Sequence, residues 1–396
     1  MPPQPHRRPL LVAGALLAAL PLAGCGLLRR KDPEPTQPID SDSPDADSPE
    51  SALPTASPTQ CLSAEEAAQR TRPSPPPREE QGPEHEALPG EHLSGIGLAL
   101  LPGGDRIAAS HTADAILLGE AETYGTVIWN TAGGTILEQL DNGLVGAIAA
   151  SPDGQLALAG HVSVEIRDRD LTVQKLLTSG EDEPFAPRAG SRITDLAITA
   201  DGSHLAVLGA DGQVTLWRID GEACEATGPL ETDLETVTAL ALCPADGALA
   251  LCGPGGPVEL WDTRTGERSS LVDGVPGRVG GLTYDADGTL FIAAENPSAL
   301  YVLTPEGELS DGPEHDQRGP FWVAAASERV AVVGRRNNRV QLWDRTRDEV
   351  RELPVVPGVT GRLAFSPDGG TLYAASPGEG VVAWSGGEQW RQFDLP

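Results

Sequence analysis

From about residue 93 onward, short apolar runs alternate with polar residues and are separated by turn residues. The runs at residues 214–217 (VTLW) and 237–242 (VTALAL) alternate with a period of two, which is typical of half-buried β-strands. Asp-Gly and similar pairs, which favour tight hairpin turns, recur between such runs. The turn after the first strand of each repeat begins at Gly103, Asp153, Asp201, Asp246, Asp287, Ser327 and Asp368. The pattern predicts an all-β fold of repeated antiparallel hairpins.

The repeats have a regular length. Their third strands end near Trp129, Ile166, Trp217, Trp261, Val302, Trp343 and Trp384. Trp217 and Trp261 are 44 residues apart, and Trp343 and Trp384 are 41 residues apart. One such unit cannot bury both faces of its sheet, so the units must stack on one another. We therefore expect seven stacked units, with the five third-strand tryptophans packed between neighbours.

Two kinds of motif carry a family resemblance. Residues 260–262 (LWD) and 342–344 (LWD) hold a Trp-Asp pair, and residues 151–154 (SPDG) and 365–369 (FSPDG) hold the hairpin turn. In these motifs the chain resembles WD-repeat proteins, which implies a seven-bladed β-propeller (WD40-like) over residues 92–396 that binds other proteins. The buried His–Ser/Thr–Asp–Trp network of that family is largely missing, with Asp211 and Trp217 as its one suggestive pair. A quinoprotein-like or TolB-like propeller therefore stays open as the class.

The ends of the repeat region predict how the ring closes. The first repeat starts at its inner strand near Leu93, and the last repeat finishes with its own outer strand at residues 388–395. We therefore expect no strand to be shared between the two ends, so that blade packing alone closes the ring. The alternative is a short closing strand formed by residues 86–92.

The N-terminus has the features of an export signal. Arg7 and Arg8 precede an apolar run of 13 residues, 10–22, which is too short for a membrane-spanning helix of about 20 residues and suits a signal peptide. The run ends in residues 22–25 (LAGC), which resemble the lipobox of bacterial lipoproteins. The resemblance implies removal of residues 1–24, a lipid on Cys25, and anchoring to a membrane of the bacterial cell envelope, on its periplasmic or extracellular face.

Residues 25–91 are rich in Pro, Ser and acidic side chains. Such a segment buries too little apolar surface to offset the entropy cost of ordering, so it is expected to be a disordered, semi-rigid tether. One short helix is expected after Ser63, because Ser63 and Glu66 match a capping box.

Charge and motifs narrow the chemistry. The chain has 58 Asp and Glu against 28 Lys and Arg, a formal net charge of −30, which opposes binding to nucleic acid. It contains no HExxH, GxSxG, P-loop or dinucleotide motif, and its histidines do not cluster at metal-ligand spacing. We therefore predict no catalytic residue, metal or cofactor. Asp285 and Asp287 resemble the start of a calcium loop but lack the later ligands, so a hairpin turn is expected there.

Two cysteines are candidates for a disulfide. Cys243 and Cys252 lie in successive strands across a turn. They are expected either to form a disulfide, which an oxidising compartment permits, or to be two buried free thiols. Nothing in the sequence supports pairing Cys61 with Cys224.

Longer connections predict a binding rim. Extra residues occur at 111–124, 179–191 and 309–320, and propeller topology brings all three to one face. Insertions on one face of a repeat protein often mark the binding face, although neutral loop drift explains them equally well. The candidate contacts are Tyr124, Phe185, Arg188, His315, Arg318, Trp322, Arg335 and Arg336.

The expected function is that of a membrane-anchored scaffold that binds one or more unknown protein partners. The alternative is a propeller enzyme of the lactonase or quinoprotein-dehydrogenase type. Such enzymes place several carboxylates, His or Arg at the channel mouth, whereas the inner strands here, such as residues 147–150 (AIAA), are small and apolar.

Overall fold

The computed structural model describes residues 60–69 and 97–395, except 112–124, 141–145, 161–162, 179–192, 256, 316–320, 335–338, 355–360, 377–379 and 387–388. All described elements belong to one compact unit, Leu53–Pro396. The predicted signal peptide and Cys25 lie outside the described residues. Within the described ranges, no helix is long and apolar enough to span a membrane.

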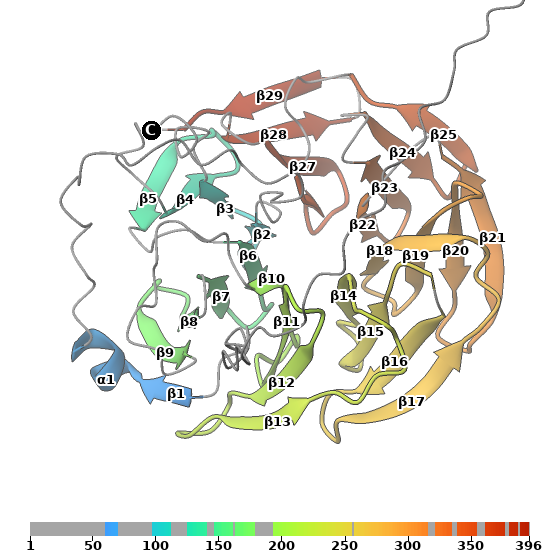
Figure 1. Ribbon diagram of the computed structural model, residues 1–396. Helices are drawn as coiled ribbons and strands as arrows, with labels where there is room; N and C mark the ends of the chain where they lie inside the picture. Colours follow the sequence, from blue (N-terminus) through green and yellow to red (C-terminus); the bar gives the residue numbers. More distant parts are fainter. Residues whose placement is uncertain are drawn as a thin grey trace, which may run out of the picture. The chain divides into compact units, whose positions relative to one another are not determined.

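The strands form seven antiparallel sheets arranged around a centre (Figure 1). Each sheet takes four consecutive strands, ordered from the inside of the ring to the outside. Blades 1–4 consist of β2 (Leu98–Leu100), β3 (Arg106–His111), β4 (Gly125–Asn130), β5 (Ile136–Leu140); β6 (Ala147–Ala150), β7 (Leu156–Ala159), β8 (Ser163–Arg167), β9 (Val173–Thr178); β10 (Ile193–Ile198), β11 (His204–Gly209), β12 (Val214–Arg218), β13 (Glu225–Pro229); β14 (Ala239–Leu242), β15 (Ala248–Cys252), β16 (Val258–Asp262) and β17 (Glu267–Val272). Blades 5–7 consist of β18 (Arg278–Tyr284), β19 (Leu290–Glu295), β20 (Ala299–Leu303), β21 (Leu309–Glu314); β22 (Phe321–Ala326), β23 (Arg329–Gly334), β24 (Val340–Asp344), β25 (Glu349–Glu352); β26 (Leu363–Phe365), β27 (Thr371–Ser376), β28 (Gly380–Ser385) and β29 (Gln389–Phe393).

The predicted seven-bladed β-propeller is therefore confirmed. The glycine of each expected Asp-Gly turn has a positive φ, from +66° at Gly369 to +110° at Gly154, a conformation that glycine adopts without steric cost. Asp285 accepts hydrogen bonds from the amides of Asp287 (3.0 Å) and Thr289 (2.9 Å), which confirms the hairpin turn at this position.

The third-strand tryptophans pack between blades as expected. Trp129 lies in a cluster with side chains of blade 7, Trp217 with blade 2, Trp261 with blade 3 and Trp384 with blade 6. All four are at most 4% exposed. Alternation along the third strand turns each of these side chains toward the preceding blade, where it fills the junction between the two sheets.

Blade 2 departs from this rule. Val164 and Ile166 face blade 3, so the alternation turns Glu165 and Arg167 to the opposite side, toward blade 1. Arg167 therefore holds the position that tryptophan holds in blades 1, 3, 4, 6 and 7, and it donates to Glu165 Oε2 (2.7 Å) and to the Leu171 carbonyl (2.7 Å). A buried, hydrogen-bonded ion pair replaces the aromatic ring at this junction.

The ring closes by packing between blade 7 and blade 1. The Trp129 indole donates to the Asp394 carbonyl (3.0 Å), and Arg391 donates to the Ala132 carbonyl (2.6 Å) while its guanidinium lies 5.0 Å from the centre of the Phe393 ring. Each sheet uses strands from one continuous stretch, apart from β1. Among the described strands, none is shared between the two ends, and the alternative closing strand at residues 86–92 lies outside the described residues.

Part of the expected tether is ordered. Residues 60–69 form β1 (Gln60–Ser63) and α1 (Ala64–Gln69), and β1 pairs with β9 as a fifth strand on the outer edge of blade 2 (Figure 1). The capping box is confirmed, because the Ser63 amide donates to Glu66 Oε2 (2.8 Å) and the Glu66 amide to Ser63 Oγ (3.4 Å). We call residues 60–69 the strap. The expected tether therefore does not run unbroken to residue 91.

The cysteines pair differently from the expectation. Cys61 of the strap forms a disulfide with Cys224, which precedes β13 of blade 3. Cys243 and Cys252 are buried free thiols, which confirms the second of the two predicted alternatives, whereas the disulfide between them is wrong. The register explains this result: Cys252 lies opposite Ala239, at the far end of the hairpin from Cys243, whose amide donates to the Ala248 carbonyl.

Candidate functional site

A buried ion pair crosses the middle of the ring. Asp195 lies on β10, the inner strand of blade 3, and Arg362 immediately precedes β26, the inner strand of blade 7. Blades 3 and 7 are not neighbours, yet Arg362 Nη2 donates to Asp195 Oδ1. The Leu196 amide donates to the same oxygen (2.8 Å). The pair therefore joins inner strands on two sides of the ring.

Burial raises the pKa of the Asp195 carboxyl, although the charge of Arg362 and backbone donors from Leu196 and Leu240 oppose the shift. Sequence reasoning missed both residues, because it took the inner strands to be small and apolar. The available signal was Asp195 inside the otherwise alternating run 193–198. The part of the chain that the structure describes contains no group of three His, Cys, Asp or Glu suited to a metal ion.

The predicted rim residues are only partly described. Tyr124, Phe185, Arg188, Arg318, Arg335 and Arg336 lie outside the described residues. His315 was expected to be exposed, but it is only 7% exposed. It directly follows β21, and its amide donates to the Ser298 carbonyl (3.0 Å), which holds it against blade 5. Trp322 is partly buried on the inner strand β22, against the cluster between blades 6 and 7. Neither His315 nor Trp322 is therefore a fully exposed contact on the rim.

The predicted insertion at 309–320 was also partly wrong. Residues 309–314 are β21, the regular outer strand of blade 5. Its Gly, Pro and acidic residues conceal the strand pattern, and its register is interrupted opposite Leu300, between the pairs Ala299–Glu314 and Tyr301–Asp311. Gly312 and Pro313 occupy this bulge.

The bulge changes how blade 5 meets blade 6. In the other six blades, a Leu, Val or Phe at the end of the outer strand packs into the junction with the next blade: Leu140, Leu177, Leu230, Val272, Leu353 and Phe393. The cluster between blades 5 and 6 contains side chains of β19, β20, β22, β23 and β24 but none of β21. At the corresponding place the chain has Gly312 and Pro313. The junction therefore lacks its outermost apolar side chain.

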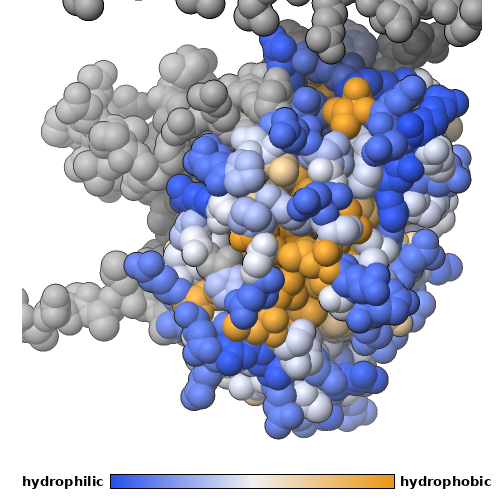
Figure 2. Space-filling view, turned by 90° about the vertical axis from the view of Figure 1, so that its right-hand side faces the viewer, coloured by the Kyte–Doolittle hydropathy of each residue, from blue (hydrophilic) through white to orange (hydrophobic). Residues whose placement is uncertain are grey.

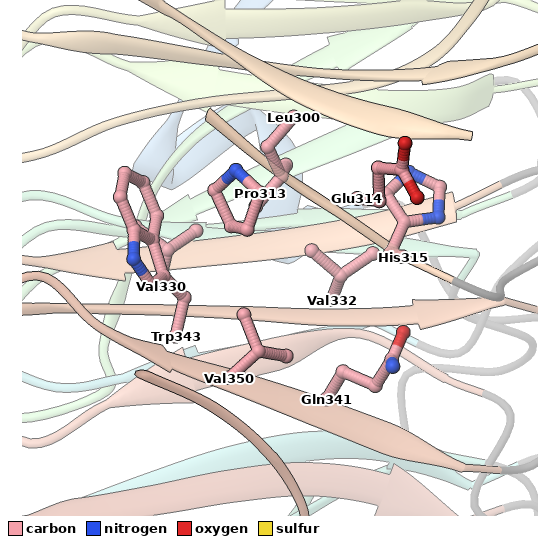
Figure 3. Close-up of a pocket in the computed structure, with 9 residues that line it drawn as sticks. All are labelled: Leu300, Pro313, Glu314, His315, Val330, Val332, Gln341, Trp343 and Val350. Carbon is pink, nitrogen blue, oxygen red and sulfur yellow. The ribbon is translucent and has the colours of Figure 1, made fainter. Parts of the chain in front are cut away.

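The result is a shallow groove on the outside of the ring, between blades 5 and 6. Leu300, Val330 and Val332, which are at most 2% exposed, form its floor. In Figure 3, Trp343 lies at one end of the groove, and Glu314 and His315 lie at the other. Its remaining walls are Pro313, Gln341 and Val350. Figure 2 views the ring from the side on which β21 and β25 lie in Figure 1 and shows apolar surface within a polar face.

Two apolar side chains of this groove, Trp343 and Val350, are exposed to solvent. Trp343 is partly exposed, unlike the four other third-strand tryptophans, and it contacts the Phe291 ring edge-on with the ring centres 6.4 Å apart. Val350 is 40% exposed, and it lies opposite Trp343 in the pairing of β24 with β25. Apolar side chains that lie together at a concave surface form a candidate contact surface for another protein.

The charges around the groove are mostly negative. Glu314 lines it, and Asp348 accepts a hydrogen bond from the Trp343 indole (3.2 Å). The nearby cations are already engaged: Arg345 binds Asp285 (3.0 Å), and Arg347 lies 4.0 Å from Asp344. Among the described residues, no cation pairs with Glu314. Within the described ranges, the groove therefore offers an apolar surface beside a carboxylate that has no cationic partner.

Comparison with known proteins agrees with this architecture. The model of the WD domain, G-beta repeat family (WD40) matches residues 186–218, which include β10, β11 and β12 of blade 3. The chain is a seven-bladed β-propeller with a WD40 repeat. Comparison with curated protein sequences finds no match.

Two solved structures share the fold. The β-propeller domain of Cps50 (Swd1) from Myceliophteria thermophila is 17% identical, with a TM-score of 0.58 over 74% of this chain and 97% of that one. U3-55K is 18% identical, with a TM-score of 0.52 over 72% of this chain and 89% of that one. At such low identity, the similarity shows the fold alone.

The matched WD40 repeat lacks the predicted Asp211–Trp217 link. Asp211 lies in the turn between β11 and β12 and accepts a hydrogen bond from the Gln213 amide (3.1 Å). Trp217 is near the other end of β12, and its indole nitrogen has no hydrogen-bond partner among the described atoms. This WD40 repeat is therefore held by apolar packing of its tryptophan.

Proposed function

We propose that this protein is an exported, lipid-anchored scaffold that binds another protein at the groove between blades 5 and 6. The observation that carries the proposal is the groove itself. Trp343 and Val350 stay exposed to solvent there, whereas an apolar side chain at the end of the outer strand fills each of the other six junctions. A propeller suits this role because its stacked sheets hold the walls of such a groove rigidly.

Two features support export and anchoring. Residues 22–25 resemble a lipobox that ends at Cys25, directly after a signal-like apolar run. The Cys61–Cys224 disulfide belongs to the type that persists in oxidising compartments outside the cytoplasm. The predicted rim contacts Tyr124, Phe185, Arg188, Arg318, Arg335 and Arg336 lie outside the described residues and stay a separate prediction from the groove.

The anchor is tested by fractionation of cells that produce the full chain. The Cys25→Ser variant should leave the membrane fraction, because the thiol that takes the lipid is absent. A variant that stays in the membrane fraction would show that the lipobox interpretation is wrong.

The scaffold is tested by cross-linking the full chain in its own cell envelope and identifying captured proteins. Val350→Arg should abolish capture, whereas Leu271→Arg should retain it, because Leu271 is equally exposed (43%) but lies on β17, away from the groove. If the wild type captures no protein, or if the purified protein turns over a sugar lactone or an alcohol without a partner, the scaffold proposal fails.

A further inference from the structure

Blade 2 shows how this propeller accepts an additional strand at its outer edge. β1 pairs with β9, and Cys61 of β1 lies opposite Leu177, the residue that seals the junction between blades 2 and 3. The Cys61 side chain packs against the same apolar cluster. An extended segment on the outside of a blade can therefore add a side chain to the junction beneath it.

Blade 5 presents the same edge without such a segment. In the described part of the chain, β21 is the last strand of its sheet. Pro313 has no amide hydrogen, so pairing with a further strand is confined to residues 309–311. Beside these residues, the bulge at Gly312 and Pro313 leaves the junction short of one large apolar side chain.

We propose that the groove binds an extended segment of the partner protein that carries a bulky apolar side chain next to an Arg or Lys. This inference rests on the proposed scaffold function and specifies the chemistry of its partner. The apolar side chain lies against Trp343, Val350 and Pro313, in the place that Leu353 or Phe393 fills at other junctions.

The negative charge of the groove favours a cationic residue next to the apolar side chain of the bound segment. Glu314 lines the groove without a cationic partner among the described residues, and Asp348 lies at the Trp343 end. A cation in the bound segment pairs with Glu314, whereas an acidic segment meets repulsion from Glu314 and from a chain of net charge −30. Complementary charge of this kind sets specificity as well as the rate of association.

The test uses the full chain with Cys25→Ser, labelled with 5-fluorotryptophan, and observes the fluorine resonances of its seven tryptophans. The Trp343 resonance is assigned by its loss in Trp343→Phe. The probes are three blocked hexapeptides: SRLLRS, its acidic counterpart SELLES and its polar counterpart SRSSRS. We expect SRLLRS to shift the Trp343 resonance in a saturable manner, with affinity at least about tenfold higher than that of either counterpart, a discrimination of about 1.4 kcal/mol.

Matched variants locate the binding. Val350→Arg should weaken SRLLRS at least about tenfold, and Leu271→Arg should change its affinity less than about twofold. The other fluorine resonances report that each variant is folded. Equal binding of SELLES, a shift confined to other tryptophans, or no saturation by SRLLRS at millimolar concentration would each overturn the inference.

Other occupants give different results. A sedimentation coefficient that rises with protein concentration, and no longer does so in Val350→Arg, would mean that a second copy of this chain fills the groove, and would overturn the proposal. Failure of the scaffold function is distinguishable, because no protein is then captured from the envelope whether or not SRLLRS binds. If Val350→Arg still captures the partner, the scaffold function stands, but the proposal that the partner binds at the groove is wrong.

Discussion

Removal of the Cys61–Cys224 disulfide should destabilise the whole propeller. The cross-link joins residues 163 positions apart, and the loop it closes contains blades 1 and 2 and most of blade 3. In the chain-entropy model, a loop of this length restricts the unfolded chain by about 5 kcal/mol, and typical disulfides contribute about 2–4 kcal/mol. Cys61→Ser combined with Cys224→Ser should therefore lower the free energy of unfolding by about 2–5 kcal/mol.

The assay compares thermal unfolding of the oxidised protein, the reduced protein and the double variant, all in a Cys25→Ser background. A loss of this size should lower Tm by roughly 3–8 °C for a domain of about 300 residues, because the entropy of unfolding grows with chain length. Reductant should lower the Tm of the oxidised protein and leave the double variant unchanged, which is the control. A double variant that unfolds within about 1 °C of the oxidised protein would refute the reasoning.

Hydrogen exchange adds a local readout. The strap is held by pairing of only four residues with β9 and by its half-buried side chains, and edge segments of this kind open most easily. Amides of residues 60–69 should lose protection in the double variant while those of β8 and β9 keep theirs. Unchanged protection of the strap would show that pairing alone holds it in place.

Three further predictions concern the interior. Leu353→Ala, which empties the sealing position between blades 6 and 7, should cost about 2–4 kcal/mol in urea unfolding, against less than about 1 kcal/mol for Val350→Ala; equal costs would contradict the role of Leu353. Because burial raises the pKa of Asp195 in the folded state, its stabilising contribution is greatest in acid and falls as pH rises through that pKa. The stability of the wild type relative to Asp195→Asn should thus decrease from about pH 4 upward, and an increase would contradict the assignment. Burial raises the pKa of the Cys252 thiol to about 12, so Ellman's reagent at pH 8 should modify Cys252 only after unfolding; modification of the folded protein within minutes would show that the thiol is accessible.

The repeat itself was predictable because its signals are local. Alternation with a period of two, Asp-Gly turns and the spacing from Trp217 to Trp261 all lie within one blade or between consecutive blades. The capping box of the strap was predictable for the same reason, since Ser63 and Glu66 are neighbours on one helical turn.

The long-range features left no such signal. The Cys61–Cys224 bond and the Asp195–Arg362 pair each join residues more than 160 positions apart, and only closure of the ring brings them together. The groove was not predictable for another reason, because its position depends on the register of β21 against β20. The composition of β21 shows a glycine and a proline, but only the register places them at the one junction position that other blades fill with Leu, Val or Phe.

Ring closure without a shared strand has a consequence for how this protein can be rearranged. Because the four main strands of each blade are encoded by one continuous stretch and the seam between blades 7 and 1 is held by side chains such as Trp129 and Arg391, new chain ends can be introduced between blades without dividing these four strands. Circular permutants cut at different blade boundaries should fold to the same ring, and whole blades are units that duplication can add or deletion can remove.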